Sequence, residues 1–278
     1  MRRTTGFATV ALLSLAVDAC DHRTVSTSGA EPPTFIVNGT PTGTEFGSVG
    51  ALLFDFNADG VINGDDEWCT GSLVAPTVFL TAAHCVVSVF TPPGSRFYVS
   101  FAPDLYARSA RFIAATGYRF DPAFGHDQGD LHDLAVVFLP ASATKGMKVY
   151  QLPQAGYLDA LHAQGALVGQ IFINVGYGTA NSRTGVPVFP YDGLRNMSES
   201  EFMALQPAWL GLNMNVSATD LGGDCYGDSG GPKFLKGNLD VIVATVTTGD
   251  FPCRATSWDY RLDTPAARVF LGRFVPLP

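Results

Sequence analysis

A serine among glycines is the residue in this chain best suited to act as a nucleophile. Ser229 lies in residues 225–232, CYGDSGGP, two positions after Gly227, whose backbone N–H could stabilise a negatively charged oxygen. A hydroxyl is a weak nucleophile at neutral pH, so this chemistry requires a base and an acid that orients the base. The segment predicts a catalytic serine if such partners occur elsewhere in the chain.

Two further segments supply those partners. His84 lies in residues 81–85, TAAHC, directly after an apolar run. Asp133 begins the strand-like residues 133–138, DLAVVF. A histidine base, a carboxylate that holds it and a serine nucleophile together predict acyl-transfer chemistry.

The three motifs in this order resemble those of the chymotrypsin-like (trypsin-like) serine endopeptidases, from about Ile36 to the C-terminus. The resemblance implies that His84 takes the proton of Ser229 as it attacks a peptide carbonyl, while Asp133 holds the imidazole. It implies an oxyanion hole made by the N–H groups of Gly227 and Ser229. Proteins or peptides would be the substrates, and catalysis would require no cofactor.

The same resemblance implies where these residues lie in the fold. Short β-rich segments alternate with glycine and proline turns, which predicts an all-β protein. Family architecture implies two packed antiparallel six-stranded β-barrels within residues 36–278, the first over about 36–150 and the second over about 160–262. Thr264 and Pro265 favour a short C-terminal helix over about 264–274.

Composition and charge fit an exported β protein and exclude one class of partner. The chain has 278 residues with 30 glycines and 18 prolines, which suits a turn-rich globular fold. A net charge of -8 without a basic run argues against nucleic acid as a partner. We expect a monomer.

The N-terminal residues have the features of an export signal. Residues 1–20 begin with two arginines after Met1, continue through an apolar stretch and end in small residues. The stretch is too short to cross a bilayer as a helix. We therefore expect a secreted, extracellular or periplasmic protein, in which the polar residues 21–35 form a linker or propeptide.

Five cysteines leave one unpaired. The family resemblance pairs Cys69 with Cys85 and Cys225 with Cys253, which an oxidising compartment permits. Cys20 is then the odd cysteine. Its segment, VDAC, resembles a bacterial lipoprotein signal in which the cysteine is lipidated, although an aspartate is unusual there. Membrane attachment is expected only through such a lipid, and ordinary signal cleavage nearby is the alternative.

Residues 35–39, FIVNG, resemble the mature start of the family. There the amine freed at Ile36 would fold inward and pair with Asp228 beside the nucleophile. A buried carboxylate without a cation is unfavourable, so this pairing implies a zymogen. Phe35 departs from the Arg or Lys found in trypsin-activated zymogens. Either another protease cleaves after Phe35, or the chain is active without cleavage.

Residues 55–66, DFNADGVINGDD, resemble a calcium-binding EF-hand loop. The candidate oxygen ligands are Asp55, Asn57, Asp59, the backbone of Val61, Asn63 and Asp66. Gly60 supplies the sharp turn, but Asp66 is shorter than the usual Glu and no helix pair flanks the loop. We predict a structural calcium, and the alternative is a loop whose Asp and Asn residues make turns.

Substrate choice depends on the residues before the serine. Gly223 stands where trypsins carry the aspartate that binds a basic side chain, and Asp224 follows it. Asp224 could still attract Arg or Lys, while Gly249 would leave the mouth of the specificity pocket open. We expect a basic preference, with a pocket for medium apolar residues as the alternative.

Two other functions remain open at this point. A catalytically silent homologue could use the same fold as a binding module. A serine esterase would keep the triad and cleave a different bond, because the same site can serve several chemistries.

Overall fold

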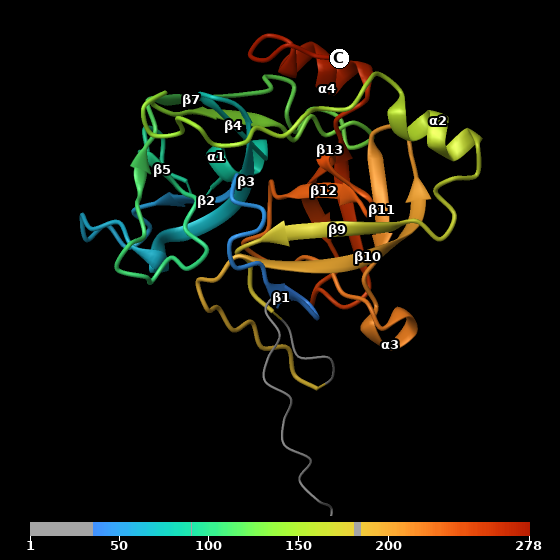
Figure 1. The fold of residues 1–278 in the computed structure, drawn as a ribbon, viewed down its shortest axis with the longest axis horizontal. Coiled ribbons are helices and arrows are strands. Elements are labelled where there is room, and N and C mark those ends of the chain that lie inside the picture. Colours follow the sequence, from blue (N-terminus) through green and yellow to red (C-terminus); the bar gives the residue numbers. More distant parts are fainter. Residues whose placement is uncertain (1–35, 90, 181–184) are drawn as a thin grey trace, which may run out of the picture. The chain divides into compact units, whose positions relative to one another are not determined.

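The computed structural model describes residues 36–89, 91–180 and 185–278, all within the compact unit Pro33–Pro278. The predicted signal, Cys20, the linker and Phe35 lie outside the described residues. The described elements form two antiparallel sheets, and apart from β1 each sheet comes from one half of the chain (Figure 1). This arrangement confirms the predicted all-β class.

The first sheet has the strand order β6-β5-β2-β3-β4-β8-β7. Its strands are β2 (Val49–Phe54), β3 (Glu67–Ala75), β4 (Val78–Thr81), β5 (Phe97–Ser100), β6 (Ile113–Ala114), β7 (Gly117–Phe120) and β8 (Ala135–Phe138). Between β6 and β7 the chain bends, and Ala115 N–H donates to Phe97 on β5 while Thr116 N–H donates to Phe138 on β8. One bent segment thus joins both edges, so the sheet curls upon itself.

The second sheet has the order β1-β10-β11-β14-β13-β12-β9, and an added pairing of β9 with β10 closes a six-stranded barrel. Its strands are β1 (Thr40–Pro41), β9 (Ile171–Gly176), β10 (Asn196–Leu205), β11 (Trp209–Asn213), β12 (Pro232–Leu235), β13 (Asn238–Gly249) and β14 (Thr256–Arg261). Although β1 precedes the first sheet in sequence, it pairs with β10 of the second.

Helices are short throughout the described chain. They are the 3-10 turn η1 (Gly64–Asp66), α1 (Ala83–Val86), α2 (Tyr157–Ala163), α3 (Val216–Thr219) and α4 (Pro265–Leu271). The predicted C-terminal helix is α4, which Thr264 caps by accepting a hydrogen bond from Ala267 N–H. The sequence analysis did not anticipate α2.

A shared apolar cluster packs the two halves together. It contains Leu80 and Val136 of the first sheet, Phe234 and Ile242 of the second, and Phe270 of α4, each at most 2% exposed. Burying one such side chain contributes about 1.5–3 kcal/mol to folding. The packing of this one cluster therefore stabilises both sheets and also joins them to each other.

A buried arginine strengthens the contact between the halves. Arg195, which directly precedes β10, is 1% exposed, and its guanidinium donates to backbone carbonyls of Val49 and Phe101 in the first half. It also donates to the carbonyls of Gly43 and Glu45, which lie in the segment leading to β2. Five N–H donors in one planar group make this many contacts possible.

Candidate active site

Two strands and a short helix bring His84 and Asp133 together. Thr81 at the end of β4 pairs with Ala135 at the start of β8, so α1 and Asp133 emerge from the same edge. The fully buried Asp133 accepts a hydrogen bond from the His84 backbone N–H at 2.9 Å and contacts His84 Nδ1 at 2.7 Å. One carboxylate therefore fixes both the backbone and the ring of the candidate base.

The same contact sets the charge of the imidazole. Burial would lower the pKa of His84, but the adjacent Asp133 charge and its hydrogen bond raise that pKa above its ordinary value. The aspartate thus favours the imidazolium that forms when His84 takes a proton.

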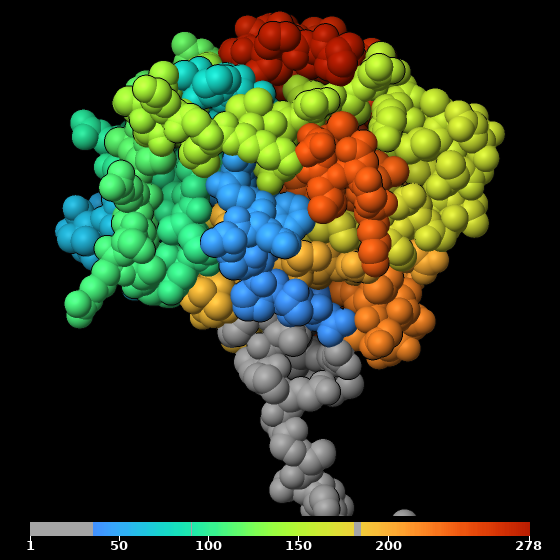
Figure 2. Space-filling model, viewed as in Figure 1, coloured from blue at the N-terminus to red at the C-terminus, as the bar shows by residue number. Residues whose placement is uncertain are grey.

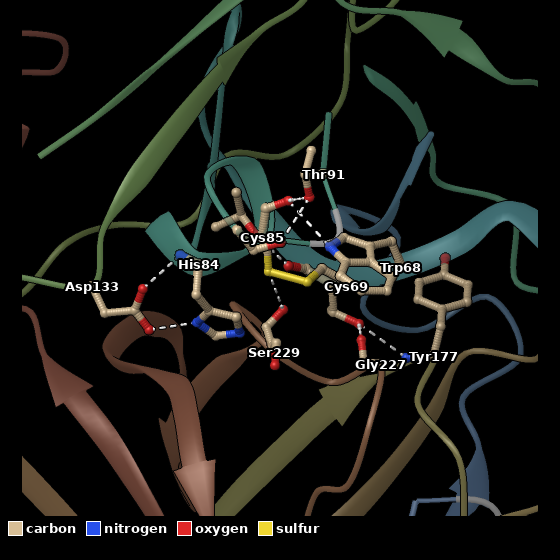
Figure 3. The surroundings of a disulfide bond; sticks show 12 residues. Trp68, Cys69, His84, Cys85, Thr91, Asp133, Tyr177, Gly227 and Ser229 are labelled. Carbon is tan, nitrogen blue, oxygen red and sulfur yellow. Dashed lines mark hydrogen bonds and ion pairs between the residues drawn. A yellow bond between two sulfur atoms is a disulfide. The ribbon is translucent and has the colours of Figure 1, made fainter. Parts of the chain in front are cut away.

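Ser229 lies opposite this pair on the loop before β12. In Figure 3 the His84 ring lies between Asp133 and Ser229. His84 and Ser229 line one cavity of about 510 Å³, called here the active-site cavity, together with Trp68, Met214, Asp224 and Gly249. The structure thus brings the three sequence-predicted catalytic residues to one place.

A glycine lets the two halves meet at the serine. Gly230 has a φ of +78°, and a Cβ there would come within 2.2 Å of Thr81 Oγ1 on β4. The Thr70 backbone N–H also donates to the Ser229 carbonyl across the halves at 2.9 Å. The glycine that follows the serine is thus required by a close approach as well as by its backbone conformation.

At the predicted oxyanion donors, the backbone of Gly227 has a conformation that favours glycine. Gly227 has a φ of +96°, and a Cβ there would lie 2.9 Å from Gly178 Cα. Within the described chain, neither the Gly227 N–H nor the Ser229 N–H donates a hydrogen bond. Both groups can therefore serve a negatively charged oxygen.

Asp228, between these two residues, is buried behind them. Its carboxylate accepts hydrogen bonds from the backbone N–H groups of Gly178 and Cys225 at 2.9 and 2.8 Å. Burial and the nearby Asp224 charge nevertheless raise the pKa of Asp228 to about 8. Glu67 also faces it, and burial together with the Asp228 charge raises the Glu67 pKa well above its ordinary value. No sequence motif pointed to Glu67.

The start of the described chain docks against the loop that precedes the serine. Ile36 is fully buried, and Val37 forms a β-bridge with Gly223, whose N–H donates to the Val37 carbonyl at 3.0 Å. A Cβ on Gly222 would lie only 1.7 Å from that carbonyl oxygen. Figure 2 shows the exposed residues that follow this segment, in blue, between residues of the two halves, while Ile36 and Val37 themselves are buried.

Both predicted disulfides are present. Cys69 on β3 is bonded to Cys85 on α1, beside the histidine. Cys225 in the serine loop is bonded to Cys253 after β13, and both residues line the active-site cavity.

Of the predicted specificity residues, Asp224 and Gly249 line the active-site cavity. Gly223 lies against Met214, where a Cβ would come within 2.4 Å of the methionine side chain. The Asp224 carboxylate pairs with the ammonium of Lys233, a residue that the sequence analysis did not single out. Lys233 follows Pro232 within an otherwise apolar strand, where a lysine is more often exposed.

The predicted calcium loop folds around its own backbone. Asp55 accepts hydrogen bonds from the N–H groups of Asp59 and Gly60, and Asp66 accepts from those of Phe56 and Asn63. Carboxylate oxygens could accept these bonds and still bind a cation. Yet across residues 36–89, 91–180 and 185–278, only Cys69, His84 and Cys85 bring three His, Cys or acidic ligand atoms within 4.8 Å of one another. Two of these are disulfide-bonded, and calcium binding stays a prediction.

Within the described residues, no helix combines the length and the apolar character needed to cross a membrane.

Comparisons with known proteins agree with this geometry. A family model described as Trypsin matches residues 53–269. A collagenase of Hypoderma lineatum is 26% identical over 205 residues, covering 70% of this chain and 72% of that protein. A vitellin-degrading protease of Bombyx mori is 28% identical over 184 residues, covering 63% and 65% respectively.

Solved structures share the fold at lower identity. Human heparin binding protein superposes with a TM-score of 0.61 at 18% identity, over 87% of this chain and 99% of that one. The VesB protease of Vibrio cholerae gives a TM-score of 0.60 at 18% identity, over 84% and 66%. At such identities the likeness establishes the architecture alone.

Proposed function

The chain belongs to the trypsin family, and from that premise we propose that it is a serine endopeptidase acting through Ser229, His84 and Asp133. The observation that carries the proposal is the 2.7 Å contact between Asp133 and His84 Nδ1, in a cavity that Ser229 also lines. That contact leaves Nε2 as the ring nitrogen available to the serine hydroxyl.

In the proposed reaction, His84 takes the Ser229 proton as the hydroxyl oxygen bonds to the peptide carbonyl carbon. The free N–H groups of Gly227 and Ser229 hold the oxyanion, and each such donor lowers the barrier by about 3–4 kcal/mol. His84 then gives its proton to the leaving amine, and the C–N bond breaks to leave an acyl-enzyme. Water, activated by the same histidine, hydrolyses that ester.

Replacing the nucleophile tests this proposal. We expect Ser229→Ala to lower kcat for a protein substrate by about 10⁶-fold while the circular dichroism spectrum stays that of the parent. Ser217→Ala, at an exposed serine on α3, is the control and should retain full activity. Unchanged hydrolysis by Ser229→Ala would exclude the triad mechanism, and ester cleavage by the parent without any peptide cleavage would favour an esterase.

We further propose that the protein is exported and is made as a zymogen cleaved after Phe35. Asp228 supports this proposal, because a buried carboxylate with a pKa of about 8 lacks a sufficient counter-charge. The amine freed at Ile36 would supply that charge beside the oxyanion loop. N-terminal sequencing of the active exported protein should begin at Ile36. An active species that retains Phe35 would rule out this activation step.

A further inference from the structure

A buried cation lies behind a residue that lines the active-site cavity. Lys233 on β12 is fully buried, and its ammonium pairs with Asp224, which lines the cavity. The ammonium also donates to the Asn174 side-chain oxygen on β9 at 2.7 Å and lies 3.4 Å from Asp259 on β14. Partners on separate strands of the barrel therefore hold the charge in place.

Asp224 has little capacity left for a cation from a substrate. One of its carboxylate oxygens faces Lys233, and the other accepts a hydrogen bond from Ser257 Oγ at 2.7 Å. The residue is only 6% exposed. An arginine or lysine of a substrate would thus be desolvated beside Lys233 without a counter-charge of its own, which is strongly unfavourable.

Asp259 also faces the Lys233 ammonium. It is fully buried and lies 2.9 Å from Ser257 Oγ, whose single proton is donated to Asp224. Burial raises the pKa of Asp259 to about 8, although Lys233 acts in the opposite direction. The Asp224–Lys233 pair is neutral by itself, and burial favours the uncharged form of Asp259.

Apolar groups line much of the active-site cavity near the Asp224–Lys233 ion pair. The buried side chain of Met214 and the Cys225–Cys253 disulfide line the cavity. Tyr226 and Phe251 also line it and are 50% and 72% exposed. The Phe189 ring packs against both, with centroids 5.0 and 5.9 Å away. Such surfaces favour apolar side chains, because burying apolar area is favourable and non-directional.

We propose that Lys233 determines specificity by neutralising Asp224, so that the cavity accepts an uncharged apolar side chain before the scissile bond and rejects arginine and lysine. This inference rests on the proposed endopeptidase function and names the substrate class of the same site. It favours the apolar alternative over the basic preference expected from the sequence.

Peptide-library hydrolysis at pH 7, with protein produced from the full chain, tests the inference. We expect kcat/KM for Leu, Met or Phe before the cleaved bond to exceed that for Arg or Lys by about 100-fold or more. Asp224→Asn leaves the Lys233 cation without this partner, so the preference for apolar over basic residues should persist or increase and should not reverse. A parent that prefers Arg or Lys, and loses that preference in Asp224→Asn, would overturn the proposal.

Lys233→Met provides the opposite test. It frees the Asp224 carboxylate, so the relative kcat/KM for Arg or Lys substrates should rise at least about 10-fold. Because this variant breaks a buried ion pair and could fold poorly, its circular dichroism spectrum is compared with that of the parent. Both substitutions break the same pair, so the residue preference of the parent and its titration with benzamidine decide the proposal if the variants do not fold.

Binding of benzamidine, an aromatic cation, separates this inference from the endopeptidase function. Calorimetry with the parent should show no saturable binding at up to about 10 mM, because both carboxylates that line the cavity are already engaged. Asp224 faces Lys233, and Asp250 accepts hydrogen bonds from the backbone N–H groups of residues 254–256. Saturable binding below about 1 mM that disappears in Asp224→Asn would contradict the inference. A protein that cleaves no peptide would refute the endopeptidase proposal, while this titration would still decide the charge of the cavity.

Discussion

Asp133 controls the charge of the proposed base, and its effect should be visible in the pH dependence of activity. Neutral His84 is the active form, so kcat/KM should rise with pH through a pKa above the ordinary histidine value. Asp133→Asn removes the charge that raises the His84 pKa, whereas burial still lowers that pKa. The pH at which kcat/KM rises should therefore move to a lower value. The plateau should fall by about 10⁴-fold. Steady-state kinetics across pH 5–9 measures both.

A second histidine–carboxylate pair supplies the control for that experiment. His132 Nδ1 contacts Asp121 at 3.0 Å, away from the active-site cavity. Asp121→Asn removes the same kind of contact and should leave the acid limb unchanged, with kcat/KM within about threefold of the parent. Equal shifts in the two variants would mean that net charge, rather than the Asp133 contact, sets the profile.

Asp228 should make the unprocessed chain less stable as pH rises. Its folded pKa of about 8 exceeds the ordinary value of 3.8, so its stabilising contribution is complete below about pH 4 and is lost by about pH 8. Relative to Asp228→Asn, the unprocessed parent should lose up to about 1.4 kcal/mol of unfolding free energy per pH unit in this window. Urea unfolding in the Ser229→Ala background measures this without self-cleavage.

Processing provides the matched comparison for that prediction. In the form beginning at Ile36, the freed amine should lower the Asp228 pKa and flatten the pH dependence between pH 4 and 8. The same slope in both forms would contradict the proposed pairing of the amine with Asp228.

Among the elements, the start of β10 has a role that no motif revealed, because Arg195 directly before it donates hydrogen bonds to the first half. Arg195→Leu should lower the free energy of unfolding by at least about 3 kcal/mol, since several buried carbonyls lose their donor. Arg268→Leu is the control: this partly exposed arginine donates to the carbonyls of Pro153 and Pro278, and its loss should cost about 1 kcal/mol. If both variants lost the same free energy of unfolding, Arg195 would contribute no more to stability than Arg268 does.

Strand patterns predicted the elements better than their pairing. The apolar run that follows Asp133 becomes β8, because local alternation and turn residues favour strands wherever they occur. The pairing of β1 with the second barrel has no local signal, because β10, its partner, lies more than a hundred residues further along the chain. The same reason hides Lys233, whose partners come from other strands and loops.

At the scale of the whole molecule, the first described segment, Ile36 and Val37, docks against the loop that precedes Ser229. In the proposed activation, this contact connects cleavage after Phe35 with the order of the oxyanion loop. Gly222→Ala would place a Cβ 1.7 Å from the Val37 carbonyl oxygen, so this segment could not dock against the serine loop as it does. We expect the free energy of unfolding to fall by about 1–3 kcal/mol and kcat/KM of the processed form to fall at least about 10-fold.

Gly47→Ala is the control for the docking prediction. Gly47 is exposed, and its Cβ would meet only the Thr44 carbonyl at an ordinary 3.7 Å. Activity and stability should stay close to those of the parent. Full activity of processed Gly222→Ala would show that docking of the first described segment does not control the oxyanion loop.

The sequence by itself indicated the proposed chemistry of this protein. His84, Asp133 and Ser229 and their order were recognisable because each lies in a short motif, and the family resemblance implied both disulfide pairs that the structure contains. Those local motifs also indicated the family and the all-β fold, since the chemistry requires fixed residue types next to one another in the chain.

Only the tertiary structure decided the electrostatics around that chemistry. From the sequence, Asp224 was expected to be available to a basic substrate. In the fold it forms a buried ion pair with Lys233, because the pairing of β12 places the Lys233 side chain in the interior of the second barrel. Glu67 and Asp228 likewise become neighbours although far apart in the chain. The energy of a charge depends on burial and on partners within a few ångströms, and both are properties of packing rather than of local sequence.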